Sequence, residues 1–466
     1  MKAQKKTWLL LHKIILMKTE LTGRRPHFRP EKRTSNPYRA LLYFTLIIGG
    51  VWLIIQVNRG HVEPLFLPTP PPTRTANSYQ MEGQAAFEAG HLGAAIDAYQ
   101  DALEIDPENL DLWVELARIQ TYSSSLLSTD TERIDRLKEA RDSIERAIEL
   151  DPDDSNALAV RAFVLNWFSS AVQSSRLDID EDPRSLLNEA ERDAARAYTL
   201  DPSNALALAF YAEILVNQQK WTQAEQYIVQ ALEIDQNSVD IYRVFGYVYE
   251  SQGYYRSAIE MYQKAVQIAP NLTFIYIRIG RNFLALERHD TAREYYERAV
   301  RINEQLGIKD PTPYIEIARA YTRDGHFFIA VLNAEQALRF NPVNANTYGQ
   351  LGSTYTRARN YEDAKPAFKC AVRGCTAEEN EIAIRVLGHG VEVEGLPLTS
   401  LTVAYYYAQY GSVLAALSRP AENNCPEALD VLEEVRTAFP NDEVLLSIIR
   451  ENQNICSRIG GTGGSQ

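Results

Sequence analysis

Residues 231–270 read ALEIDQNSVDIYRVFGYVYESQGYYRSAIEMYQKAVQIAP, and this stretch decides the fold of the 466-residue chain. Its first and last hexapeptides, ALEIDQ and AVQIAP, share the pattern Ala-x-x-Ile and mark out one repeat of about 34 residues. Such a period in a helix-rich sequence is typical of stacked helical hairpins, because each hairpin is too small to bury its apolar face alone. The sequence therefore predicts an all-α solenoid.

Related hexapeptides recur along most of the chain. They end at Pro107, Pro152, Pro202, Gln236, Pro270, Glu304, Pro342, Thr376 and Pro440. The intervals from Pro202 to Glu304, and from Pro342 to Thr376, all have the length of the interval between Gln236 and Pro270. Every other interval is longer, which indicates the same repeat with an insertion. We therefore expect about nine hairpins.

Within residues 231–270, small and aromatic residues fall where two antiparallel helices would meet, since residues three and four apart share a helix face. The first helix presents Tyr242, Phe245, Gly246 and Tyr249, and the second presents Ala258, Tyr262 and Ala265. Gly246 and Ala258 lack bulk where the helices approach most closely, and Gly253 permits the turn between them.

These residues and spacings resemble the tetratricopeptide repeat family, which has W, L, G and Y on its first helix and A, F, A and P on its second. Further matches are Trp113, Leu116 and Ala117; Tyr276, Ile279, Gly280, Phe283, Ala292, Tyr296 and Ala299; Tyr314, Ile317, Ala318, Tyr321, Ala330 and Ala337; and Tyr348, Leu351, Gly352, Tyr355, Ala364, Phe368 and Ala371. The resemblance covers roughly residues 76–440, with a degenerate first helix in the third unit at 158–162. It implies a right-handed superhelical solenoid, whose inner curve is lined by the first helix of each repeat and binds a protein or peptide.

An apolar segment precedes the repeats. Residues 40–57, ALLYFTLIIGGVWLIIQV, carry no charge. At about 1.5 Å per residue they span about 27 Å as a helix, close to the ~30 Å of a bilayer's hydrocarbon core. We expect a transmembrane anchor. The alternative is a cleaved signal peptide, although no small-x-small cleavage site follows closely.

Charge sets the orientation of this helix. Residues 1–39 carry 11 Lys and Arg against two acids, whereas residues 58–74 carry two against one. The basic leader at 1–39 is therefore expected in the cytoplasm and the repeats outside it, in a bacterial cell envelope. Within the leader, residues 8–17 form either an interfacial helix or sequence ahead of a start at Met17.

Two further segments flank the solenoid. The linker at 58–75 contains five prolines and favours an extended polyproline spacer, although a ligand for a proline-recognition domain is an alternative. Residues 460–466 are expected to form a flexible tail. Residues 75–466 hold 35 Lys and Arg against 58 Asp and Glu, a net charge of −23, which argues against a nucleic-acid partner.

The four cysteines suggest two disulfides. If the helices before and after 439–441 fold back on each other, Cys456 in the capping helix at 443–459 faces Cys425. Cys370 and Cys375 lie five residues apart at a helix end and are a second candidate pair. Such bonds persist in oxidising compartments. The alternative for all four is buried or free thiols, and neither pair has zinc-site spacing.

Catalytic motifs are missing from the sequence, which has no GxSxG, Walker loop or HExxH. We expect no enzyme, no cofactor and no metal site. The alternative is an active site within the insertions at 121–133, 169–184 and 377–402. The first two insertions are expected to lengthen the turns of the second and third hairpins. The last insertion predicts a short helix at 379–387 and an alternating stretch at 391–398, which either augments a partner's sheet or packs on the last repeats.

Four residues are the candidate ligand contacts on the inner curve: Arg243, Tyr247, Arg281 and Arg319. Arginines set among acids can receive a carboxylate or an acidic peptide through forked hydrogen bonds. The alternative is that these arginines pair with Glu250 or Glu316.

The sequence thus predicts a non-catalytic scaffold, anchored by one membrane helix, with its repeats outside the cytoplasm and a protein or peptide in its concave groove. An accessory subunit of an enzymatic complex and a cytosolic chaperone-type adaptor are the alternatives. Neither the partner nor the oligomeric state follows from these residues.

Overall fold

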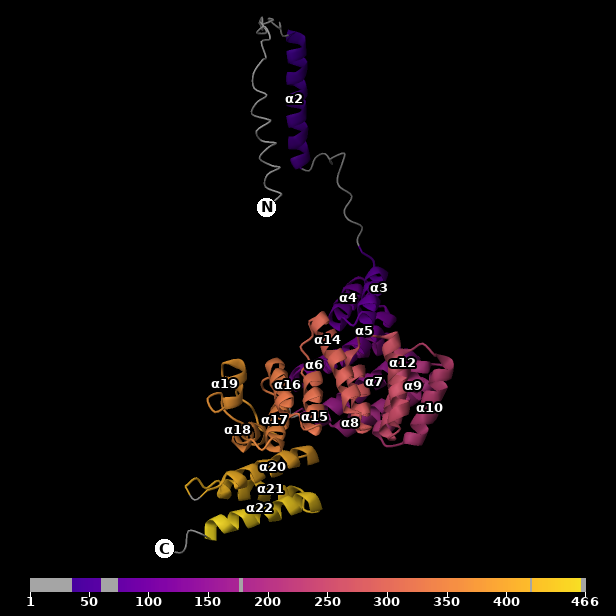
Figure 1. The fold of residues 1–466 in the computed structure, drawn as a ribbon. Coiled ribbons are helices and arrows are strands. Elements are labelled where there is room, and N and C mark those ends of the chain that lie inside the picture. The colour runs from indigo at the N-terminus through magenta and orange to yellow at the C-terminus, as the bar shows by residue number, and fades with distance from the viewer. Residues whose placement is uncertain (1–35, 60–73, 176–178, 420, 462–466) are drawn as a thin grey trace, which may run out of the picture. The chain divides into compact units, whose positions relative to one another are not determined.

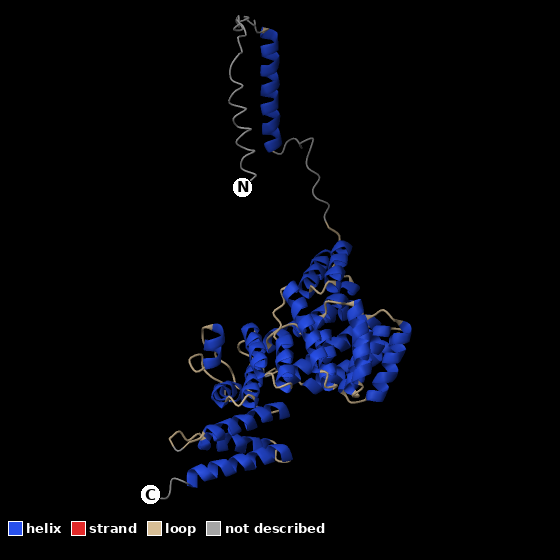
Figure 2. Cartoon of the chain, in the orientation of Figure 1, coloured by secondary structure: helices blue, strands red, loops and turns tan. Residues whose placement is uncertain are grey.

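The computed structural model describes residues 36–59, 74–175, 179–419 and 421–461. In these residues every regular element is a helix, and two isolated bridges are the only β-type pairings (Figures 1 and 2). The chain divides into two compact units, Met1–Thr73 and Arg74–Gln466. Most of the basic leader, the proline-rich linker and the tail lie outside the described residues.

The described part of the first unit is the helix α2 (Pro37–Asn58). It begins at Pro37 because proline suits a first helical turn and because Asn36 Oδ1 accepts the N–H of Tyr38 at 3.1 Å. Residues Pro37–Gln56 have a mean hydropathy of 1.8 and are long and apolar enough to cross a membrane, by length and composition alone. A signal sequence would meet the same criterion.

The described residues of the second unit form nine helical hairpins, as expected, with one short helix in the insertion between the last two hairpins and one further helix after the ninth. The hairpins are α3 (Ala76–Glu88) with α4 (Leu92–Ile105), α5 (Leu110–Ser124) with α6 (Asp130–Leu150), α7 (Ser155–Ser174) with α8 (Pro183–Leu200), α9 (Ala205–Asn217) with α10 (Trp221–Ile234), α11 (Val239–Ser251) with α12 (Tyr255–Ile268), α13 (Thr273–Ala285) with α14 (His289–Leu306), α15 (Thr312–Arg323) with α16 (Phe327–Phe340), α17 (Ala345–Arg357) with α18 (Tyr361–Val372), and α20 (Leu401–Leu417) with α21 (Cys425–Ala438). The last helix, α22 (Glu443–Gly461), packs against α20 and α21. The all-α hairpin fold is confirmed.

The recurring hexapeptide both ends one helix and starts the next. Two residues after it stands an Asn, Asp or Ser whose side chain accepts a backbone N–H in the first turn of the following helix. These caps are Asn109, Asp154, Asn204, Ser238 and Asn344. In these five connections, the hexapeptide and the cap residue that follows it together specify the end of one helix and the start of the next.

Close helix contact within a hairpin depends on a missing side chain. A Cβ at Gly246 would lie 2.7 Å from the ring of Tyr262, and one at Gly352 would lie 2.8 Å from the ring of Phe368. Gly253, in the turn, has a φ of 80°. The roles that the sequence predicts for these glycines agree with the structure.

The first two insertions differ from expectation. They were expected to lengthen turns, but most of their described residues extend helices instead. α5 continues to Ser124, and α7 runs for 20 residues, to Ser174, compared with 13 in α9. The reason is that 121–133 and 169–184 hold few residues that break a helix.

The third insertion packs on the repeats. Its helix α19 (Glu381–Leu387) starts two residues later than predicted, where the side chain of Asn380 caps it. Val393 pairs with Cys375 in an antiparallel bridge, and both Val393 and Leu396 are buried. This alternating stretch is therefore a packed element and not an open edge for a partner's sheet.

The early hairpins also contact later ones across the inner curve. Arg118 on α5 forms a buried ion pair with Asp240 on α11 at 3.1 Å. Asn271, between α12 and α13, donates from Nδ2 to the carbonyl oxygen of Ala89 at 2.9 Å. Side chains of the protein itself therefore fill part of the inner curve of these hairpins. The sequence analysis predicts an open groove at this place, and the structure differs from that prediction.

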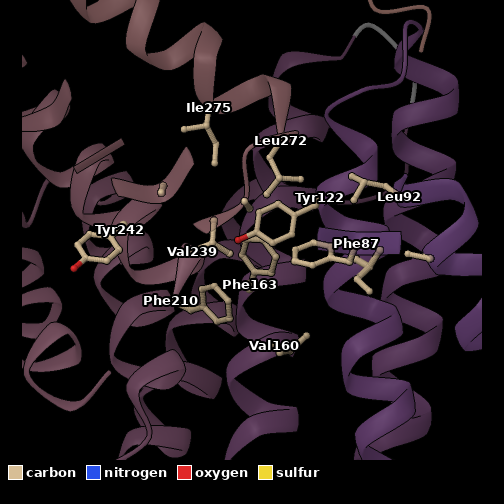
Figure 3. Packing of buried hydrophobic residues seen from close by; sticks show 14 of the residues in the cluster. Phe87, Leu92, Tyr122, Val160, Phe163, Phe210, Val239, Tyr242, Leu272 and Ile275 are labelled. Atoms are coloured by element: carbon tan, nitrogen blue, oxygen red, sulfur yellow. The ribbon is translucent and has the colours of Figure 1, made fainter. Parts of the chain in front are cut away.

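A continuous apolar core supports this contact. One buried cluster runs from Phe87 on α3 to Ala320 on α15. In Figure 3, Phe87, Tyr122 and Phe163 lie together with Leu272, which precedes α13. The ring centroids of Phe87 and Tyr122 are 6.3 Å apart, and those of Tyr122 and Phe163 are 5.2 Å apart.

Candidate binding cavity

A cavity of about 630 Å³ lies among the first helices of the early hairpins. Its lining residues come from α5, α6, α7, α9, α11, α12 and α13, and from the start of α15 with the segment before it. Aromatic side chains (Trp167, Tyr247 and Phe274) and arginines (Arg278 and Arg281) form much of the lining. The cavity therefore combines apolar surface with cationic groups.

Arg243 forms the inner wall of this cavity. Its guanidinium donates from Nη1 and Nη2 to Glu213 at 2.9 and 2.7 Å and from Nε to the hydroxyl of Tyr122 at 3.0 Å. Burial opposes its charge, but the carboxylate of Glu213 outweighs this, so the pKa of Arg243 is raised. Arg243 is 6% exposed. It was expected to receive a ligand's carboxylate, and the structure places it on an internal one instead.

Tyr247 belongs to a row of polar groups that crosses three helices. Its hydroxyl donates to Oδ1 of Asn217 at 2.7 Å, and Nδ2 of Asn217 donates to Oδ1 of Asn166 at 2.7 Å. The guanidinium of Arg278 lies 5.1 Å from the ring of Tyr247. Burial raises the pKa of Tyr247, so its hydroxyl stays protonated and can act as a donor.

Arg281 and Arg319 share one carboxylate. Glu316, which is almost fully buried, accepts Nε and Nη2 of Arg281 at 3.0 and 2.7 Å, and Nη1 of Arg319 at 3.1 Å. Two guanidinium groups against one carboxylate leave one positive charge uncompensated within this group. Within the described part of the chain, Nη1 of Arg281 has no hydrogen-bond acceptor. Arg281 lines the cavity, and Arg319 does not.

Of the two acids expected as alternative partners of the candidate arginines, the structure pairs only one with them. Glu316 does pair with predicted site arginines, whereas Glu250 pairs with Arg278 at 2.9 Å. Arg278 was missed by the sequence reasoning, although it lies three residues before Arg281 and so on the same helix face. Trp167 was also missed because it lies in the hairpin whose first helix departs from the family pattern.

One buried acid also lines the cavity. Asp310 precedes α15, and its Oδ1 accepts the backbone N–H of Thr312 at 2.8 Å. Burial raises the pKa of Asp310 against the effect of this hydrogen bond. The negative charge of this carboxyl group is therefore less favourable than it would be in water.

The cysteines lie away from the cavity and form two disulfides. Cys370–Cys375 has a Cα–Cα distance of 4.8 Å, and Cys425–Cys456 one of 5.5 Å. The second bond joins α21 to α22. Among the described residues, no group of three or more His, Cys, Asp or Glu side chains could hold a metal ion.

Three segments, residues 76–109, 239–272 and 275–306, match the family model of the tetratricopeptide repeat. These segments are tetratricopeptide repeats. They correspond to the hairpins α3–α4, α11–α12 and α13–α14, and the first helices of the last two hairpins line the cavity. No curated protein matches the chain.

Several solved structures match the chain at low identity and with TM-scores below 0.5. The pilF protein of Pseudomonas aeruginosa is 17% identical, with 45% of this chain and 90% of that chain covered and a TM-score of 0.36. A tetratricopeptide repeat protein from Parabacteroides merdae is 15% identical, with 60% and 98% covered and a TM-score of 0.35. PilW, a type IV pilus biogenesis factor, is 17% identical, with 53% and 98% covered and a TM-score of 0.40.

Proposed function

We propose that this chain is a non-catalytic scaffold that holds an acidic segment of a partner protein in the cavity. The observation that carries the proposal is the arrangement around Glu316, where two arginines share one carboxylate and Arg281, which lines the cavity, has an Nη1 group without an acceptor among the described residues. A ligand carboxylate placed there would pair with Arg281 through a charge-assisted hydrogen bond.

The four predicted contact residues take different roles in this proposal. Arg281 binds the ligand's carboxylate, and Tyr247 forms the adjoining aromatic wall. Arg319 acts indirectly, because it is the second positively charged group that pairs with the carboxylate of Glu316. Arg243 holds α9 and α11 together through Glu213 and is a positioning residue.

The size of the cavity limits what it can accept. Ligand pockets commonly measure about 300–1,000 Å³, and this one measures about 630 Å³. It suits one acidic side chain with the few residues around it, or a carboxyl terminus, rather than a folded domain. The remainder of a partner would lie outside the cavity.

Affinity capture from native membranes tests this site. With the full-length chain as bait, Arg281→Ala should reduce recovery of the bound protein at least tenfold. Arg301→Ala is the matched control, because Arg301 is an exposed arginine that pairs weakly with Glu297, at 3.9 Å, on α14. Equal recovery with both variants would contradict the proposed site.

We also propose that α2 is an uncleaved anchor and that the repeats lie outside the cytoplasm. The apolar length of α2, the basic residues of 1–39 and the two disulfides support this arrangement. In this arrangement residues 1–39 form the cytoplasmic leader, residues 58–75 form the extended spacer, and residues 460–466 form the flexible tail.

An alkaline phosphatase fused after residue 461 tests the orientation, because this enzyme is active only where its own disulfides form. We expect an active fusion that stays in the membrane fraction. An inactive fusion would instead favour the cytosolic adaptor, and an active fusion released without residues 1–57 would identify a signal peptide.

A further inference from the structure

The outer face of α16 differs from those of the three second helices that precede it, α10, α12 and α14. Counted from the first residue of each helix, the second, third and sixth positions are polar in α10, α12 and α14. These residues are Thr222, Gln223 and Gln226; Arg256, Ser257 and Glu260; and Asp290, Thr291 and Glu294. In α16 the same positions are Phe328, Ile329 and Leu332. The hairpin fold itself therefore does not require apolar residues there.

These three residues, here named the α16 patch, lie on the surface. Phe328 is 77% exposed, Ile329 41% and Leu332 49%. Phe328 and Leu332 are four residues apart and Ile329 and Leu332 three apart, so they share one helix face. Exposing adjacent apolar side chains is unfavourable in water, and such patches commonly mark interaction sites.

We propose that the α16 patch docks an amphipathic helix of a partner protein whose polar face is basic. The patch extends over a single helical turn, which matches one set of apolar residues at i, i+3 and i+4 on a second helix. Its three side chains offer a few hundred Å² at most, whereas a stable dimer buries about 800 Å² on each partner. The area thus fits a short helix better than a second copy of this chain.

Charge also favours a basic partner. Residues 75–466 carry a net charge of −23, so two copies of the repeat domain repel each other and a basic helix is attracted. Contact with the α16 patch would give specificity, and the attraction between opposite charges would speed association. This surface is formed by α16, which contributes no residue to the cavity lining, so the two sites can be tested separately.

A defined peptide tests the binding chemistry. The probe is an amphipathic Leu/Lys helix of about five turns with Leu at i, i+3, i+4 and i+7, and a peptide of the same composition with a scrambled order is its control. Both are titrated against the full-length chain in nanodiscs of zwitterionic lipid, with empty nanodiscs subtracted. We expect the ordered peptide to bind at least tenfold more tightly than the scrambled one.

Matched variants locate the binding. F328T/I329Q/L332Q gives α16 the polar residues of α10 and should weaken binding of the ordered peptide at least tenfold. R256T/S257Q/E260Q makes the equivalent change in α12 without altering the net charge and should change binding less than twofold. Arg281→Ala in the cavity should leave it unchanged. Equal effects of the α16 and α12 variants, or no effect of the α16 variant, would overturn the proposal.

A photoreactive phenylalanine analogue at position 328 identifies the natural occupant in native membranes, with the same analogue at position 256 as control. A cross-linked segment with a basic amphipathic pattern, found only from position 328, supports the proposal. A second copy of the chain, its own residues 60–73, lipid, or no product would each overturn it.

Discussion

Gly246 shows how one residue can set the spacing of a hairpin. The ring of Tyr262 occupies the place of the missing side chain, and Ala258, the neighbouring small residue on α12, is fully buried. The repeat spacing predicts this contact because the same two positions recur in successive repeats. The contact needs only local geometry, and so the sequence sufficed to find it.

Substitution at two glycines separates close packing from helix propensity. Gly246→Ala places a Cβ 2.7 Å from the ring of Tyr262, and the overpacking should cost about 1–3 kcal/mol. Gly93→Ala, in α4, meets no atom within 4 Å and should be neutral or stabilise by up to about 1 kcal/mol. Urea unfolding of both variants and of the parent protein measures the change in the free energy of unfolding. A similar change in both variants would show that propensity, and not the contact with Tyr262, dominates.

At the level of single residues, the candidate site was only partly predictable from the sequence. Spacing placed Arg243, Tyr247 and Arg281 on first helices facing the inner curve, and they do line one cavity. It did not reveal that Arg243 would form an ion pair with Glu213 and donate a hydrogen bond to the hydroxyl of Tyr122. Tyr122 lies several hairpins away from Arg243 along the chain, and a contact of that kind depends on the rotation accumulated over those hairpins.

At the scale of elements, the capping helix α22 illustrates a different constraint. The turn at 439–441 and the cysteine spacing predicted that α22 folds back along α21, and the structure joins the two helices through Cys425 and Cys456. α22 contacts α20 and α21, the last hairpin of the array. A terminal helix has a neighbour on one side only, so a covalent link contributes more there than within the array.

Removing each disulfide in turn should give unequal effects. In the chain-entropy account, a bond closing 31 residues contributes about 4 kcal/mol and one closing five residues about 2 kcal/mol. We expect C425S/C456S to raise hydrogen exchange throughout α22, while C370S/C375S affects only residues near 371–396. Intact protection of α22 in C425S/C456S would mean that packing alone holds this helix.

Insertions were the least predictable elements. Loss of the regular repeat period located them, but the period cannot distinguish a longer turn from longer helices. α6 has 21 residues, and its start is fixed by a capping box of Thr129 and Glu132 that could have been read from the sequence. Side-chain chemistry at the helix start was therefore a better guide than the interval between repeats.

For the whole repeat domain, the decisive feature is the contact between the early hairpins and α11. Arg118 and Asp240 are both almost fully buried, and Asp240 also accepts the hydroxyl of Tyr122. Tyr122 in turn accepts Nε of Arg243, which binds Glu213. A network of buried charges thus links α5, α9 and α11, and it adjoins the cavity through Arg243 and Glu213.

Removing one charge from this network should open the contact. Asp240→Ala leaves Arg118 buried without its full complement of acceptors, which in general costs about 3–5 kcal/mol. Hydrogen exchange in α5 and α11 should then rise by a factor of about 100 or more, since about 1.36 kcal/mol corresponds to a tenfold change. Exchange in α20 and α21 should stay unchanged, because this loss is local to the hairpins around α5 and α11.

Two companion variants show whether the unpaired charge is the cause. Glu115→Ala removes the other, more exposed partner of Arg118 and should have a much smaller effect. The double variant R118M/D240L removes both charges and should recover most of the lost protection, because replacing a whole buried ion pair is often nearly neutral. If Asp240→Ala and Glu115→Ala behaved alike, the apolar core around Tyr122 and Phe163 would be what closes the inner curve, and the ion pair would be incidental to it.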